Sequence, residues 1–138
     1  MMNKNYTIEW RNPAQTILEI KYLGDAILSD ILSSNVDAFS IINTVPHEVL
    51  LLHNSQGYNV DVDLLTVGKV NDSVYSKFPP IPNNLKLVII ILSQRATRVM
   101  MGSALEVLDR FFLRRKMTSV VASMQEAEVQ IIKMGFSS

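Results

Sequence analysis

The order of apolar and polar residues predicts alternating strands and helices along the chain. Residues 6–10 and 16–22 alternate between apolar and polar side chains, which is typical of strands with one buried face. Asn12 and Pro13 stand between the two segments and favour a turn. We therefore expect an antiparallel hairpin at the start of the chain.

A helix is expected directly after this hairpin. Gly24 ends the second strand and Asp25 supplies an N-cap residue. The apolar residues that then recur at helical spacing are Ile27, Leu28, Ile31, Leu32, Val36, Phe39 and Ile42. Residues 33–35 are polar and could break or kink this helix, and Pro46 marks its end.

Two later segments are apolar over the length of a strand, apart from Glu48 and Lys86. Residues 48–52 and 85–92 lack alternation, which favours strands that are covered on both faces. The first of them leads into the polar segment 53–57, which we interpret as a loop. Residues 61–75 allow a helix, although Gly68 and Asn71 weaken it.

The last third of the chain predicts a helix, a strand and a capped helix. Apolar residues at helical spacing extend to Arg115, and a strand follows at residues 117–121. Ser123 and Glu126 form a capping-box pattern, and Gly135 is a helix stop. We therefore expect a single α/β domain over residues 1–138, with its core at about 6–134 and a mixed sheet of about five strands flanked by helices.

Composition excludes several functional classes. The chain has 138 residues, 48% of them apolar, and no cysteine, so disulfides and thiol chemistry are absent. Its 13 basic and 13 acidic residues balance, which argues against a nucleic acid or an anionic membrane as partner. The polar first twelve residues do not resemble a signal peptide, and the longest apolar run is too short to span a membrane. We expect a cytoplasmic protein.

The order of elements resembles the STAS-like group, small proteins similar to anti-sigma factor antagonists. The resemblance covers residues 6–134 and rests on the Gly24-Asp25 turn, the apolar strand before His53 and the distal pattern of the chain. That pattern comprises Lys86-Leu-Val-Ile-Ile-Ile, Arg98, Leu108, Phe112 and Ser123-Met-Gln-Glu-Ala127. The resemblance implies a mixed sheet with helices mainly on one side, and a protein that binds partners rather than catalyses a reaction.

In that group, a serine in the loop after the middle strand is phosphorylated to switch partner binding. The matching loop here is 53–58, which lacks the group's Asp-Ser-Ser-Gly pattern. Ser55 is the only serine in it. It is either a phosphorylation site, where the added charge would be large, or an ordinary polar loop residue.

A candidate anion site follows from the expected sheet. If strands 48–52 and 85–92 are parallel neighbours, their following loops open at the same edge, where α/β sheets usually bind ligands. A helix N-terminus and two arginines would favour phosphate or a carboxylate there. The loops offer His53, Asn54, Ser55, Ser93, Gln94, Arg95, Thr97 and Arg98. In the alternative interpretation, the arginines are solvated or pair with Asp61 or Asp63.

The helix expected at 93–115 has a wide apolar face. Met100, Val107 and Phe111 lie beside its core stripe. They either meet the final helix in the core or form a surface for a homodimer or a protein partner.

No catalytic, metal or cofactor motif is recognised in the sequence. His47 and His53 lie too far apart for one metal, and neither a Ser-His-Asp order nor a Gly-rich phosphate loop is present. We therefore predict a non-enzymatic regulatory or partner-binding module of the STAS-like type. The alternative is a carrier or sensor of a small anionic or lipid-like ligand.

Overall fold

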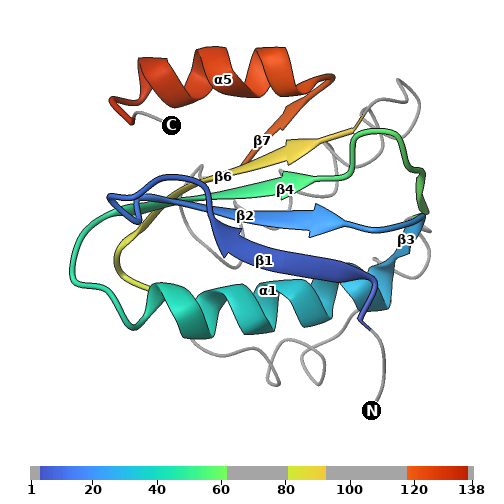
Figure 1. Ribbon diagram of the computed structural model, residues 1–138, viewed down its shortest axis with the longest axis horizontal. Coiled ribbons are helices and arrows are strands. Elements are labelled where there is room, and N and C mark those ends of the chain that lie inside the picture. Colours follow the sequence, from blue (N-terminus) through green and yellow to red (C-terminus); the bar gives the residue numbers. More distant parts are fainter. Residues whose placement is uncertain (1–3, 62–80, 93–117, 137–138) are drawn as a thin grey trace.

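The computed structural model describes residues 4–61, 81–92 and 118–136, which form a five-stranded mixed sheet between two helices (Figure 1). The strands lie in the order β1-β2-β4-β6-β7. Their bounds are Tyr6–Trp10 for β1, Ile17–Tyr22 for β2, Val49–Asn54 for β4, Leu85–Ile91 for β6 and Thr118–Val121 for β7. β1 and β2 are antiparallel, and the other neighbours are parallel. The predicted α/β class, the hairpin and the mixed sheet are confirmed.

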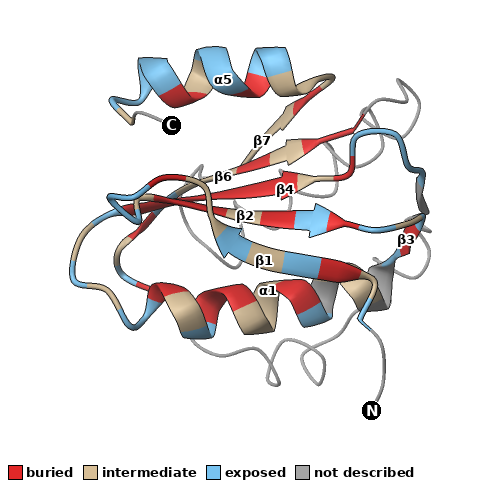
Figure 2. Cartoon of the chain, in the orientation of Figure 1, coloured by how far each residue is buried: buried red, intermediate tan, exposed pale blue. Residues whose placement is uncertain are grey.

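The two described helices cover opposite faces of the sheet. Helix α1 (Leu28–Ile42) packs on one face and helix α5 (Met124–Lys133) on the other (Figure 1). Because successive side chains of a strand point to opposite faces, each central strand contributes to both cores. In β4, Leu51 belongs to the core under α1, whereas Leu50 and Leu52 belong to the core under α5. Figure 2 shows buried residues along the central strands and on the inward sides of both helices.

Helix α1 begins later than the sequence predicted, and Asp25 is not its N-cap. Ala26 and Ile27 instead form the short strand β3 (Ala26–Ile27), which pairs in parallel with β5 (Val60–Asp61). The Asp25 carboxylate accepts a hydrogen bond from the Asn59 N–H (2.9 Å), so it binds the loop before β5 and does not cap the helix. Ile27 is the N-cap, and its N–H donates to Asp30 Oδ2 (3.0 Å). Residues 33–35 do not break the helix.

Both ends of α5 are capped as predicted, except that Glu126 accepts from the residue before the N-cap and not from the N-cap itself. The Ser123 hydroxyl accepts a hydrogen bond from the Glu126 N–H (3.2 Å), and Glu126 in turn accepts from the Ala122 N–H (2.7 Å). At the other end, Gly135 has a φ of +83°, and the Phe136 N–H donates back to the Ile131 carbonyl (3.1 Å). This is a Schellman motif, which suits glycine because the left-handed backbone disfavours side chains.

Several predictions lie outside the described residues. These are the helix expected at 93–115, with Met100, Val107 and Phe111, and most of the segment 61–75. Neither of the described helices is long and apolar enough to span a membrane.

Candidate functional site

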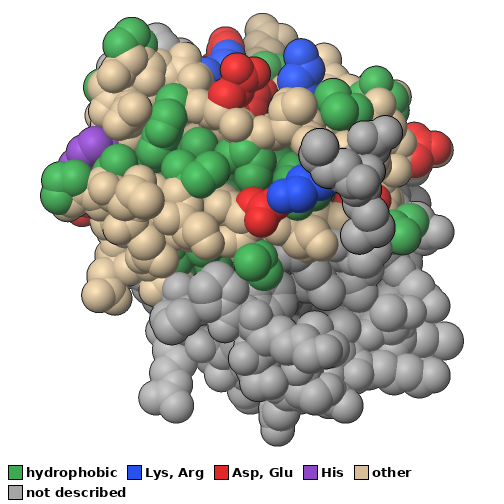
Figure 3. All heavy atoms as spheres, turned by 60° about the horizontal axis from the view of Figure 1, so that its bottom comes forward, with side chains coloured by type: hydrophobic (Ala, Val, Ile, Leu, Met, Phe, Trp, Pro, Cys, Tyr) green, Lys and Arg blue, Asp and Glu red, His purple; other side chains and the backbone are tan. Residues whose placement is uncertain are grey.

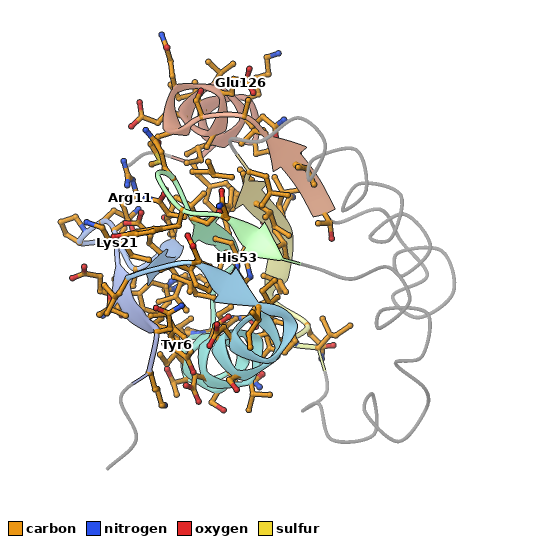
Figure 4. All side chains as sticks on the ribbon, turned by 90° about the vertical axis from the view of Figure 1, so that its right-hand side faces the viewer. Tyr6, Arg11, Lys21, His53 and Glu126 are labelled. Atoms are coloured by element: carbon orange, nitrogen blue, oxygen red, sulfur yellow. The ribbon has the colours of Figure 1, made fainter. Side chains whose placement is uncertain are left out.

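His53 lies inside strand β4 and not in a loop, so the sequence placed the end of this strand too early. Only 2% of the residue is exposed. It extends the row of Val49 and Leu51 that faces α1, because residues two apart in a strand share a face. The sequence ended the strand at Leu52 since a histidine and an asparagine follow, but both belong to β4. The side chain of His53 points into the space between the sheet and α1 (Figure 4).

Each ring nitrogen of His53 has a hydrogen-bond partner from another element. Nδ1 lies 2.9 Å from the Tyr22 hydroxyl of β2, and Nε2 lies 2.9 Å from Asn35 Oδ1 of α1. The Tyr22 hydroxyl is also 3.0 Å from the hydroxyl of Ser34, whose single proton is within reach of both the Tyr22 oxygen and the Ile31 carbonyl (2.8 Å). We call the group of Tyr22, Ser34, Asn35 and His53 the buried polar network. It connects the middle of α1 to two neighbouring strands.

Burial keeps both titratable members of this network neutral. Desolvation lowers the pKa of His53 from 6.5 to about 4, and it raises the pKa of Tyr22 well above its usual value. With Asn35 Oδ1 as acceptor, the neutral imidazole carries its proton on Nε2 and accepts from the Tyr22 hydroxyl at Nδ1. The Tyr22 and His53 rings are also nearly parallel, with centroids 6.1 Å apart. Such a satisfied, water-excluded network is suited to holding α1 in one position on the sheet.

The sequence contains a signal for the buried polar network. Ser34 falls on the same helical stripe as Ile31, Ala38 and Ile42, at spacings of three or four residues. A polar residue on a buried stripe needs a hydrogen-bond partner inside the protein, because burying it alone is unfavourable. Residues 33–35, which could have broken or kinked the helix, continue it, and Ser34 and Asn35 bind side chains of β2 and β4.

Asn54 points to the opposite face from His53. Its amide donates to Glu19 Oε2 (2.9 Å), and its Oδ1 accepts from the Gln56 N–H (3.1 Å). Glu19 also accepts from Arg11, which reaches across to Glu128 of α5 (3.1 Å). His53 and Asn54 therefore do not converge on one ligand position, although the sequence grouped them in one loop.

Ser55 is buried, with 1% of the residue exposed. Its hydroxyl donates to the carbonyl of Ile91 at the end of β6. Its own carbonyl accepts from the Tyr58 N–H (3.0 Å), which closes a tight turn in which Gly57 has a φ of +91°. In this conformation the hydroxyl is not at the surface, so a kinase would reach it only after the turn opened.

The other half of the predicted anion site lies outside the described residues. It comprises Ser93, Gln94, Arg95 and Arg98. The parallel pairing of β4 with β6 is confirmed, so the ends of both strands do lie at one edge of the sheet. Among residues 4–61, 81–92 and 118–136, no group of three acidic or histidine side chains could hold a metal ion.

The same edge of the sheet carries exposed apolar side chains. Leu23 is 52% exposed, Ile27 54% and Tyr58 38%. The Ala26 N–H donates to the Asn59 carbonyl (2.8 Å), which joins the segment of Ile27 to the segment of Tyr58, and Leu23 follows the end of the neighbouring strand β2. We call these three residues the apolar edge patch.

The fold and this site define an α/β protein with a mixed sheet and a buried polar network under α1. No protein-family model matches the chain, and neither the curated proteins nor the solved structures contain a significant match to it.

Proposed function

We propose that this chain is a non-catalytic regulatory module of the STAS-like type, acting in the cytoplasm, that binds a protein partner at the carboxyl edge of its sheet. The single observation that supports this proposal is the contrast between bonded polar side chains and exposed apolar side chains at that edge. The polar side chains of His53, Asn54 and Ser55 make hydrogen bonds within the protein, whereas the apolar edge patch is exposed. Exposed apolar and aromatic side chains are suited to protein contacts.

The internal bonds argue for binding over catalysis. A general base must reach a substrate proton and needs a pKa near the working pH, but His53 is buried and its pKa is about 4. A nucleophilic serine needs an exposed hydroxyl, whereas that of Ser55 donates to a backbone carbonyl. The order of elements in the sequence resembles the STAS-like group. That resemblance implies a protein that binds partners without catalysis.

The test is a comparison of purified baits in quantitative affinity purification from the native host. The wild-type chain is compared with Leu23→Ser and Tyr58→Ser, which remove exposed apolar surface from the patch. The matched control is Ile132→Ser on α5, because Ile132 is 72% exposed and lies outside the patch. We expect the three variants to stay folded, since exposed substitutions usually change stability little.

The expected result is a protein that is enriched with the wild type and the Ile132 variant and lost with the two patch variants. Calorimetry with that purified partner should then reproduce the difference. Equal enrichment with all baits would contradict a role for the patch. A small molecule that co-purifies in place of any protein would favour the carrier function.

A further inference from the structure

Strand β1 forms an open edge of the sheet within the described part of the chain. It is the terminal strand, and among the described strands it pairs with β2 alone in the main sheet. The Arg11 N–H donates to the Ile17 carbonyl (2.8 Å), and the Leu23 N–H donates to the Asn5 carbonyl (3.0 Å). In an antiparallel ladder, every second residue directs its backbone groups at the partner strand. Tyr6, Ile8 and Trp10 therefore direct their N–H and C=O groups away from the sheet.

This edge lacks most of the features that usually prevent strand addition. Proteins protect edges with prolines, bulges, charged side chains or very short strands, and Glu9 is the one charged residue of β1. The five residues of β1 contain no proline, and all five pair with β2 in one continuous register. Figure 4 shows β1 at the outer margin of the sheet, with α1 set further in.

Apolar side chains lie beside the open edge on the face that carries α1. Ile8 and Trp10 of β1 and Ile41 of α1 are only partly buried, although all three pack against the core. Figure 3 shows a band of hydrophobic side chains across this face. A strand added to β1 would therefore gain both backbone hydrogen bonds and apolar contacts.

We propose that a second copy of this chain pairs with β1, antiparallel, about a two-fold axis at Ile8. In this register Ile8 faces Ile8 of the second copy, Tyr6 faces Trp10, Thr7 faces Glu9, and Asn5 faces Arg11. The strand is thus self-complementary: aromatic residues pair twice, and no like charges stand directly opposite each other. A register shifted to centre on Glu9 would oppose two glutamates.

This homodimer uses a different surface from the apolar edge patch, so it stands or falls independently of the proposed function. The pairing joins two sheets edge to edge, and each copy satisfies the outward backbone groups of the other. The two-fold symmetry makes the contact closed, so the association stops at a dimer.

The assay is sedimentation velocity over a concentration series, with tryptophan emission measured in parallel. Trp10 is the only tryptophan in the chain, so its emission reports directly on β1. We expect dimer formation and a change in Trp10 emission over the same concentrations. A strand contact of this kind should have a dissociation constant below about 1 mM, so a monomer at that concentration overturns the proposal.

Charge substitutions at Thr7 test the register. Thr7 is exposed, and in its own sheet it lies opposite Lys21. In the dimer it would also lie opposite Glu9 of the second copy. Thr7→Glu should therefore strengthen the hairpin and weaken the dimer, and Thr7→Lys should do the opposite. Thr7→Gln is the neutral control of similar length. With two such pairs per dimer, the dissociation constants of the Lys and Glu variants should differ about tenfold.

If a Thr7 variant stabilises the monomer but weakens the dimer, or the reverse, the substitution acts at the interface. A general effect on folding would change both quantities in the same direction. Thermal unfolding of the same variants at low concentration supplies the monomer stability. The reverse order of dimer affinities, or no difference between the three variants, overturns the proposal.

Cysteine cross-linking gives a second readout, because the natural chain has no cysteine. In an antiparallel hydrogen-bonded pair, the two Cα atoms at position 8 would lie about 5.5 Å apart, within the range of a disulfide. Diamide accepts the two electrons and two protons that the thiols lose. We expect Ile8→Cys to form a covalent dimer readily. Thr7→Cys is the control, since its counterpart would lie diagonally at about 7–8 Å. Equal linkage of both variants, or none at position 8, overturns the register and the proposal.

Discussion

The buried imidazole of His53 should make the protein sensitive to acid. Its pKa is about 4 in the folded protein and 6.5 in the unfolded chain, because burial disfavours the charged form. Between these two values the unfolded chain binds more protons, so the stability of the fold rises with pH. The contribution of neutral His53 is fully present above pH 6.5 and is lost as the pH falls to about 4.

The size of this effect follows from the difference between the two pKa values. A fall from 6.5 to about 4 corresponds to about 3 kcal/mol of unfolding free energy. The full value applies because His53 is almost entirely buried. Domains are commonly stable by about 5–15 kcal/mol, so this single group should remove a large share of the stability.

His53→Gln is the variant that isolates the contribution. Glutamine can accept from Tyr22 and donate to Asn35, but it does not ionise. Asp37 also contributes to acid sensitivity. Although partial burial opposes the shift, hydrogen bonds from Lys4 and Tyr6 lower the pKa of Asp37, so its contribution is lost as the pH falls through that lowered value. Asp37 acts equally in both proteins, and it cancels in their difference.

The assay is urea unfolding of both proteins at several pH values from 7 to 4. We expect the variant to be less stable at pH 7, and the difference in unfolding free energy to shrink by about 3 kcal/mol on acidification. Parallel stability curves would refute the reasoning, because they would show that His53 has the same pKa in the folded and unfolded chains. Titration of the imidazole resonance by NMR measures the folded pKa directly.

Three further predictions concern stability and are measured by chemical unfolding. Tyr22→Phe should cost about 1–3 kcal/mol because it leaves buried hydrogen-bond partners unsatisfied. Tyr58→Phe, at an exposed tyrosine, should be nearly neutral. Equal losses of stability in the two variants would contradict a stabilising role of the buried polar network. Asn84→Asp should cost about 2 kcal/mol or more, since the two N–H protons of the Asn84 amide are shared among three carbonyls at the end of α1 and in the loop after it. Asn84→Ala should cost less. Gly135→Ala should cost about 1 kcal/mol through its φ of +83° alone, because no atom lies within 4 Å of the added Cβ; an unchanged stability would contradict the strain.

Local patterns in the sequence were sufficient for elements whose signals lie within the element itself. Strand β1 alternates, strand β6 is apolar apart from Lys86, and α5 starts after its N-cap Ser123 and ends before Gly135. Side-chain periodicity and helix capping depend on neighbours within about four residues, so the sequence alone determined these features. It also indicated that both faces of the central strands are covered, because β4 and β6 have no alternating polar residues over most of their length.

Tertiary contacts decided the features whose partners are distant in the sequence. Asp25 has the local properties of an N-cap, but pairing with Asn59, 34 residues away, moved the start of α1 to Leu28. His53 has the local properties of a loop residue, but Tyr22 and Asn35 satisfy its ring, and this allows it to stay in β4. A polar group can be buried only where the fold supplies its partners. The sequence therefore determined where most of the described strands and helices form, and only the tertiary structure decided which polar side chains became part of the core.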